Sequence, residues 1–271
     1  MRRLRVAVPG PQSGPRAAYG ELIRKAVAGL GSLPQLEIRL LDDKAEPTVA
    51  ARVAAAIVKD GIDVVVGHFN SDCARAAMPV YQAAGVPLLL PASTASGLAD
   101  GRSVFRLCAD ESRQAEAIVA LWRGTLHGRR PSVWSDGSAY AIRLCQQLET
   151  AFGSTLPDAP QPDDIGAAKG AVVAYCGSHV AVLERFAEEG SHWPGTAVCC
   201  DDCFVDEFDS QARPGTWVCA PHADYGRLLQ EAIVVAHRIL ALKTARWQDV
   251  FDAEGEHRNA AWRMHKVGQI Q

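Results

Sequence analysis

The chain has 271 residues, of which 48% are apolar and 22% are charged, and its formal net charge at pH 7 is -3. This composition is typical of a folded globular protein, and it excludes a disordered tail, a collagen-like repeat and a disulfide-stapled miniprotein. At roughly 100–200 residues per domain, the length fits one large domain or two modest ones, and we expect two lobes.

Short apolar runs alternate with helical periodicity along the first hundred residues. Glycine and proline separate the segments, as at Gly61 and Gly85. The alternation predicts a parallel sheet with helices on both faces. The expected strands cover residues 4–8, 36–41, 62–66, 86–90 and 104–107, with helical patterns at 22–30, 47–57 and 72–84.

The same alternation starts again after residue 107 and predicts a second doubly wound lobe. Between its elements, residues 153–166 are rich in Pro and Asp, which favours a surface loop. A long amphipathic helix is expected at 224–242, and residues 250–252 with 261–267 are interpreted as a hairpin. The other expected elements are helices 111–122, 139–152 and 180–189 and strands 132–134, 171–175, 196–200 and 216–219.

Charge and hydropathy indicate whether the protein binds nucleic acid or crosses a membrane. The only basic run is Arg2, Arg3 and Arg5, so nucleic acid is a poor candidate, because phosphate binding needs a concentrated positive face. The longest apolar runs fall far short of the about 20 residues that cross a bilayer. We expect no membrane span, and no export signal is recognisable at the start of the sequence.

Cysteine usage bears on the compartment. Most of the eight cysteines lie in apolar segments, where a reduced thiol packs as a small hydrophobic group. We therefore expect the reducing cytoplasm, with the periplasm as the alternative if a signal peptide has been removed. The cysteines are Cys73, Cys108, Cys145, Cys176, Cys199, Cys200, Cys203 and Cys219.

Ligands of open α/β sheets bind beyond the carboxyl ends of the strands, so the loops after strands are the candidate sites. In the loop at 67–72, the Ser71 hydroxyl and the start of the next helix could hold a carboxylate, although Ser71 or Asp72 could equally be a helix N-cap. The loop at 91–96 has small residues that let a ligand approach backbone amides, or it is an ordinary hydroxyl-rich turn.

Two loops of the second half offer different chemistry. The neighbouring acids Asp201 and Asp202 favour an ammonium group or a metal as guest, although solvated surface acids are the common alternative. In the loop 135–140, Tyr140 could cover a cleft or simply pack within its helix.

A set of motifs in the first 107 residues resembles one known family. The sequences Ser13-Gly14-Pro15, Leu41-Asp42-Asp43, Gly67-His68 and Pro91-Ala92-Ser93-Thr94 occur in the order found in type I periplasmic binding proteins. The resemblance is to the branch that binds leucine, isoleucine and valine. It implies two α/β lobes joined by three crossings, which we place at 1–107 with 222–258 and at 108–221 with 259–271.

The resemblance also implies a ligand, an amino acid or a small amide, in a cleft between the lobes. The family's pattern gives the ligand carboxylate to Ser71 and the loop at 92–94, and the ammonium to the Ala92 carbonyl and Asp202, or Asp201 if the register shifts. Aromatic rings at Tyr19 and Tyr140 would flank the ligand. The expected ligand-binding residues are Ser71, Ala92, Ser93, Thr94, Tyr19, Tyr140, Asp202, Asp201, Asn70 and Ser178.

Departures from the family pattern shape the functional expectation. Ala45 and Asn70 stand where transport members often have a disulfide, and Ser178 stands where relatives often have an aromatic ring. The part after Pro221 is shorter than in typical members, which could favour a homodimer or a regulatory protein partner. We expect a non-catalytic cytoplasmic sensor or carrier with no cofactor and no resident metal.

Two alternatives remain at this point. One is a metal- or thiol-dependent enzyme that uses Cys200, Cys203, Cys219 and His222, with Asp201, Asp202 and His192 nearby in the sequence. The other is a scaffold or regulatory protein that has lost its ligand. No dinucleotide fingerprint or phosphate-binding loop is present.

Overall fold

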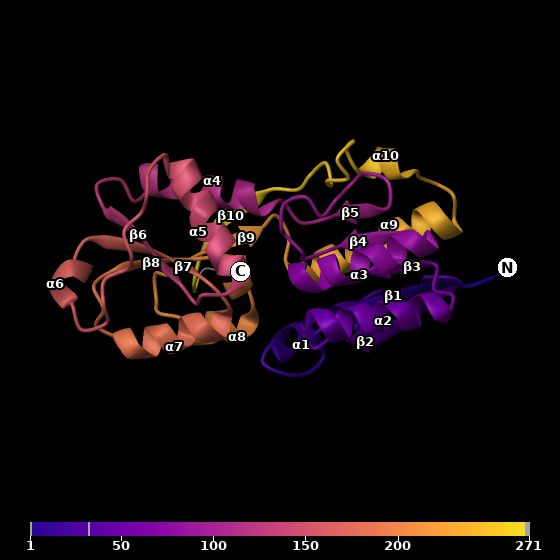
Figure 1. Ribbon diagram of the computed structural model, residues 1–271, viewed down its shortest axis with the longest axis horizontal. Helices are drawn as coiled ribbons and strands as arrows, with labels where there is room; N and C mark the ends of the chain where they lie inside the picture. Colours follow the sequence, from indigo (N-terminus) through magenta and orange to yellow (C-terminus); the bar gives the residue numbers. More distant parts are fainter. Residues whose placement is uncertain (1, 32, 269–271) are drawn as a thin grey trace. The chain divides into compact units, whose positions relative to one another are not determined.

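The computed structural model describes residues 2–31 and 33–268, and the chain divides into two compact α/β units (Figure 1). Unit 1 comprises Met1–Ala109 and His222–Ala261, and unit 2 comprises Asp110–Pro221 and Trp262–Gln271. The boundaries predicted from the sequence are 107/108, 221/222 and 258/259. Residues 1, 32 and 269–271, which the expected lobes include, lie outside the described residues.

Unit 1 contains a five-stranded parallel sheet in the order β2-β1-β3-β4-β5. Its helix α2 packs on α3 (Figure 1). Its helix α1 packs on α9. The strands are β1 (Leu4–Gly10), β2 (Leu36–Asp42), β3 (Val64–Val66), β4 (Leu88–Leu90) and β5 (Val104–Arg106). The helices are α1 (Ala17–Ala28), α2 (Pro47–Lys59), α3 (Ser71–Ala84), α9 (Tyr225–Ala236) and α10 (Trp247–Val250).

The sheet of unit 1 is buried on both faces, which explains its continuous apolar strands. Ala7 and Val65 belong to one buried cluster with Ile57 of α2 and Ala77 of α3. Because successive strand residues point to opposite faces, their neighbours such as Val6 and Val66, which are also buried, lie on the other face of the sheet.

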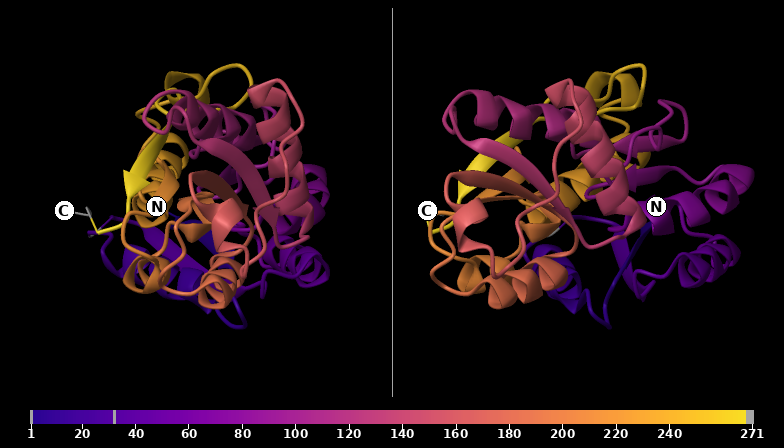
Figure 2. Two further views of the ribbon diagram at one scale, coloured as in Figure 1. Left: turned by 90° about the vertical axis from the view of Figure 1, so that its left-hand side faces the viewer. Right: turned by 60° about the vertical axis from the view of Figure 1, so that its left-hand side comes forward.

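Unit 2 has a mixed sheet in the order β10-β9-β8-β7-β6. Neighbouring strands from β6 to β9 run parallel, while β10 pairs antiparallel with β9, from Trp262 opposite Pro221 to Lys266 opposite Trp217. Figure 2 draws β10 as the yellow arrow. The strands are β6 (Arg130–Ser135), β7 (Ala171–Cys176), β8 (Thr196–Cys199), β9 (Trp217–Pro221) and β10 (Trp262–Lys266). The helices are α4 (Glu111–Arg123), α5 (Ala139–Phe152), α6 (Ile165–Ala168), α7 (His179–Glu189), η1 (Asp201–Cys203) and α8 (Asp206–Gln211).

The predicted hairpin near the end of the sequence is wrong. Residues 250–252 and 261–267 form no hairpin, because β10 takes β9 as its partner and Phe251 makes only an isolated bridge with His257. The expected surface loop 153–166 is mostly exposed and irregular up to the start of α6, although Leu156 and Ala159 are buried and Asp158 forms an isolated bridge with Val133 of β6. The helix expected at 224–242 is present, as α9 up to Ala236 and then as a π-helical turn, η2 (His237–Ala241).

A tight contact between two glycines shapes the end of unit 1. Gly101 and Gly255 both have positive φ, and a Cβ on Gly255 would lie 2.6 Å from the Gly101 nitrogen. The contact allows residues 255–257 to run along the edge of β5, where Arg106 N donates to Gly255 O at 2.8 Å and His257 N donates to Arg106 O at 2.8 Å.

Within the described residues, no helix is both long enough and apolar enough to cross a membrane.

Candidate functional site

The strand order of unit 1 locates its candidate ligand site. In a sheet ordered 2-1-3-4-5 the direction of winding reverses between β1 and β3, and ligands bind beyond the carboxyl ends of the strands at this switch point. The segment after β3, Gly67 to Ser71, lies at this point, and the loop at 91–96 follows the neighbouring strand β4.

The segment after β3 ends in a capped helix. The N-cap of α3 is Asn70, whose side-chain oxygen accepts hydrogen bonds from Asp72 N at 3.0 Å and Cys73 N at 3.2 Å. The interpretation of Ser71 or Asp72 as the cap is therefore wrong. Ser71 is the first helical residue, and its Oγ accepts from Ala95 N at 3.2 Å, which joins the segment after β3 to the loop after β4.

The loop after β4 is buried, and a hydrogen bond ties it to the segment after β3. Ala92 and Thr94 are buried, and Ser93 is fully buried, with its hydroxyl donating to His68 O at 2.9 Å. Ser93 therefore fixes the two loops to each other through its side chain. Because its hydroxyl is used in this way, Ser93 would contact a ligand through its backbone atoms.

A buried ion pair that the sequence analysis missed positions this loop. Arg106, at the end of β5 and only 2% exposed, donates through Nη1 to Thr94 O and Ala95 O, both at 2.8 Å. Its Nε donates to Glu256 Oε1 at 2.9 Å, so the guanidinium joins the loop to the segment beside β5. An arginine inside an apolar strand was the signal available in the sequence.

A second buried polar group lies under the same loops. Asp43 and His68 are fully buried, with 2.6 Å between Asp43 Oδ2 and His68 Nδ1, and His68 Nε2 lies 3.1 Å from the Tyr81 hydroxyl. Burial, and after it the charge of Asp43, raises the pKa of Tyr81 above its usual range. Tyr81 therefore stays a neutral hydroxyl, and the three side chains connect β2, β3 and α3.

Tyr19 lies in the interior of unit 1. It is 2% exposed, and its ring centroid is 6.3 Å from those of Phe69 and Tyr225. The ring therefore packs among other aromatic side chains. Its place beside a ligand stays a prediction.

The paired acids of unit 2 are buried rather than solvated. Asp201 and Asp202 lie in η1, directly after β8, and are 5% and 9% exposed. Asp201 Oδ1 accepts from Gln114 Nε2 at 2.7 Å and from the Tyr140 hydroxyl at 2.5 Å. Surface acids are therefore excluded as the explanation of this pair.

The partners of Asp201 define the role of Tyr140. Burial and the charge of Asp201 raise the pKa of Tyr140 well above its usual value, so the phenol stays protonated and donates. Gln114 lies in α4 and is fully buried, and nothing in its position within that helix marked it beforehand.

Ser178 has a local structural role. It is the N-cap of α7, where its Oγ accepts from Ala181 N at 3.2 Å, and its own backbone nitrogen donates to Asp136 Oδ2 at 2.9 Å. Asp136 follows β6 and Ser178 follows β7, so this contact joins two strand ends of unit 2.

Within the part of the chain that the structure describes, Cys200, Cys203 and Cys219 do not form a group of metal ligands with His222. Cys200, Cys203 and Cys219 are buried thiols of unit 2, whereas His222 belongs to unit 1. Burial raises the pKa of Cys203 and of Cys219 well above its usual value, which disfavours the thiolate that a metal needs. Within the described residues, the group that could hold a metal consists of His222, Glu231 and His257, without a cysteine.

Comparison with known proteins places the chain in a family. A sequence model of the periplasmic binding protein family matches residues 3–162, more than half of the chain. The chain belongs to this family. The predicted resemblance is thereby confirmed, and it extends beyond the motifs of the first 107 residues.

The curated relatives are amino acid-binding proteins by name. The Leu/Ile/Val-binding protein of Escherichia coli (strain K12) is 36% identical over 157 residues, which cover 54% of this chain and 43% of that protein. A leucine-, isoleucine-, valine-, threonine- and alanine-binding protein of Pseudomonas aeruginosa is 35% identical over 101 residues, 34% of this chain and 27% of that protein. The matched stretch thus spans less than half the length of these relatives.

Solved structures show the same fold over nearly the whole chain. The branched-chain amino acid transporter substrate-binding protein LivJ from Streptococcus pneumoniae, in complex with isoleucine, has a TM-score of 0.78 at 18% identity and covers 98% of this chain and 100% of that one. The leucine-binding protein LivK from Thermotoga maritima has a TM-score of 0.71 at 19% identity, covering 86% of this chain and 81% of that one. The predicted α/β fold with two lobes and parallel sheets is confirmed.

The comparisons also bear on class and compartment. The family and the relatives named here are binding proteins, which agrees with the expectation of a non-catalytic protein. They do not support the expected cytoplasmic location, since the matched family is that of periplasmic binding proteins, the alternative considered above.

Proposed function

We propose that the chain binds a small amino acid, or a related amide, without catalysing a reaction. The observation that carries the proposal is the joined pair of loops after β3 and β4 in unit 1. Ser71 Oγ accepts from Ala95 N, and Arg106 and Ser93 hold the second loop from inside the unit. Such preorganised backbone groups bind at little conformational cost.

The carboxylate of the ligand is assigned to Ser71 and the loop at 92–94. Within the described residues, the hydrogen bond recorded for Ser71 Oγ uses its oxygen as acceptor, which leaves the hydroxyl hydrogen to donate to an anion. The position at the start of α3 also favours a negative charge, although Asn70 already caps two of the backbone N–H groups there.

The ammonium group of the ligand is assigned to the acidic turn of unit 2. Asp202, the acid that the family resemblance assigns first, is the carboxylate that we give to the ligand, and the neighbouring Asp201 accepts hydrogen bonds from Gln114 and Tyr140. The names of the relatives favour a branched-chain aliphatic side chain, as in leucine, isoleucine or valine.

The biological role that we propose is that of a carrier serving a transporter. One structural neighbour is described as a transporter's substrate-binding protein, and the family is periplasmic, so these likenesses favour a carrier over a cytoplasmic sensor or a homodimer. Cell fractionation tests this part by itself. Recovery in the periplasmic fraction supports the carrier, and recovery in the cytoplasm would return the role to sensing.

Calorimetry tests the binding function and its residues. The panel comprises leucine, isoleucine, valine, threonine, alanine and small amides, titrated into the full chain and into Ser71→Ala and Asp202→Asn. Each variant should weaken binding by about ten- to a hundredfold, because each removes a hydrogen bond to a charged group worth about 1.5–3 kcal/mol.

Exposed residues of the same types provide matched controls. Ser191→Ala and Asp163→Asn change solvent-facing side chains and should leave the affinity unchanged. If the unmodified chain gives no binding heat with any compound of the panel, the proposed function is refuted. Binding that neither Ser71→Ala nor Asp202→Asn weakens would keep the function and refute this assignment of residues.

A further inference from the structure

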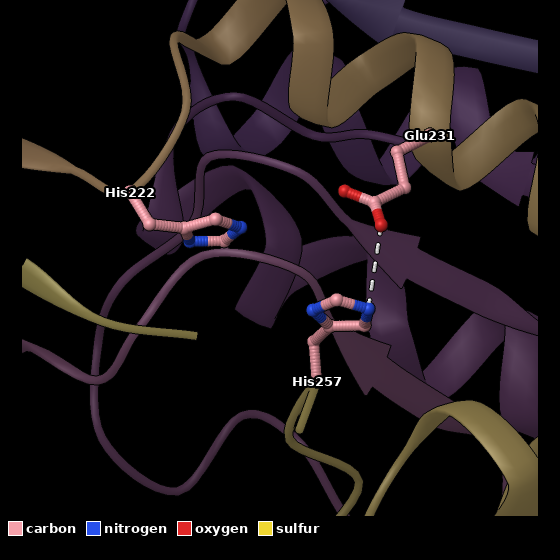
Figure 3. Close-up of side chains that lie close together, drawn as sticks. All are labelled: His222, Glu231 and His257. Carbon is pink, nitrogen blue, oxygen red and sulfur yellow. Dashed lines mark ion pairs between the residues drawn. The ribbon is translucent and has the colours of Figure 1, made fainter. Parts of the chain in front are cut away.

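Three side chains that the proposed function does not use converge within unit 1 (Figure 3). His222 directly follows β9, Glu231 lies in α9, and His257 lies in the segment beside β5. One ligand atom from each residue lies within 4.8 Å of those from the other two. Two imidazoles and a carboxylate form a donor set that zinc-type cations prefer.

The contact between His257 and Glu231 has the dimensions of a metal site. His257 Nε2 lies 3.4 Å from Glu231 Oε1, beyond the about 2.7–3.2 Å of an ordinary N–H···O hydrogen bond. Two ligands of a tetrahedral zinc ion, each about 2.0–2.1 Å from the metal, are about 3.3 Å apart. The observed separation therefore matches one edge of such a tetrahedron.

The burial of His257 is a second, independent observation. Its side chain is 7% exposed, and within the described residues its Nδ1 is buried without a hydrogen-bond partner. The ring is therefore largely shielded from water. A small shift of the ring would let a cation between Nε2 and the Glu231 carboxylate take this histidine as a ligand.

The two histidines are held in place by their backbones. His257 N donates to Arg106 O at 2.8 Å, and His222 N donates to Ala261 O at 2.9 Å. Their rings lie nearly parallel, 11° apart, with centroids separated by 6.1 Å. Figure 3 shows the His222 ring directed toward the Glu231 carboxylate and His257. The site thus needs movement of side chains only.

We infer that unit 1 binds one divalent cation of the zinc class through His222, Glu231 and His257. Three protein ligands leave a fourth position of the tetrahedron for water or another small ligand. This site uses none of the cysteines considered from the sequence and none of the residues assigned to the amino acid.

Titration of the untagged, chelator-treated full chain with zinc chloride tests the inference. We expect one zinc ion per chain, and His257→Ala, His222→Ala and Glu231→Gln should each weaken binding at least about tenfold. The controls His192→Ala and Glu184→Gln change exposed residues of the same types in unit 2 and should bind zinc as the unmodified chain does. Glu231 is only half-buried, so Glu231→Gln tests the site even if the histidine variants fold poorly.

Cobalt(II) substitution gives a readout of the ligand type. Visible bands of four-coordinate cobalt without a thiolate charge-transfer band support nitrogen and oxygen ligands. A thiolate band would overturn the inference in favour of the cysteines. A stoichiometry near zero, or unchanged affinity in the folded Glu231→Gln and His257→Ala variants, would also overturn it.

Discussion

Replacing Arg106 with methionine tests the role of the buried ion pair in unit 1. The substitution removes the guanidinium from an almost fully buried position and deprives Glu256 of its partner and Thr94 O and Ala95 O of a donor. Breaking a buried pair costs about 3–5 kcal/mol, and each carbonyl that loses its donor adds about 1 kcal/mol. Since the Glu256 side chain is 16% exposed and partly rehydrates, we expect a total at the lower end of this sum, about 5 kcal/mol.

Companion variants give the order of effects. Glu256→Gln retains an oxygen that can accept from Arg106 and should cost about 1–3 kcal/mol. Arg39→Ala breaks an exposed pair with Asp60, both side chains being about half exposed, and should cost less than about 1 kcal/mol. Urea unfolding, monitored by hydrogen exchange in peptides of unit 1, measures the change in the free energy of unfolding for each variant. If Arg106→Met costs no more than Arg39→Ala, the ion pair does not hold the loop.

Two further predictions concern titratable groups. Burial raises the pKa of Asp100, but hydrogen bonds from Val104, Ser103 and Arg102 outweigh it and bring the pKa to about 2. In the unfolded chain the pKa of an aspartate is ~3.9, so the ionised Asp100 stabilises the fold fully above about pH 4, and this stabilisation is lost as the pH falls toward 2. Asp100→Asn should therefore lower the free energy of unfolding by about 1 kcal/mol at pH 7 and make it depend less on pH between about 4 and 2. An unchanged dependence of stability on pH in the variant would contradict this. A hydrogen bond with Cys176 lowers the pKa of the Cys145 thiol, so Cys145 should react with iodoacetamide before the other cysteines, as measured by peptide mass spectrometry. Cys145→Ser should remove this fast phase of labelling. Labelling of Cys176 before Cys145 would refute the prediction.

Local sequence signals account for most of the secondary structure. The helix expected at 139–152 has these bounds, because Ser138 caps its start and Gly153, in the left-handed region, ends it. The partner of β10 could not be inferred in the same way. Strand pairing depends on contacts between distant segments, and nothing local distinguishes β9 from a hairpin partner next to residues 261–267.

The candidate site shows the same division. Loops after strands were recognisable because the strands were, and so Ser71 and the loop at 91–96 were found. Arg106 and Glu256 are 150 residues apart in the chain, so their pairing required the structure. His222 was recognised as a possible ligand but assigned to the cysteines, because sequence proximity suggested partners that the fold does not provide.

The antiparallel pairing of β10 with β9 imposes an order on synthesis. Roughly forty-five residues separate the end of β9 from the end of β10, and at about 5–20 residues per second a ribosome needs about 2–9 s to make them. During that interval the nascent chain carries β9 without its outer neighbour, an open sheet edge of the kind that recruits other chains. Unit 1 also needs His222–Ala261, so neither unit can complete its folding before this segment has been synthesised.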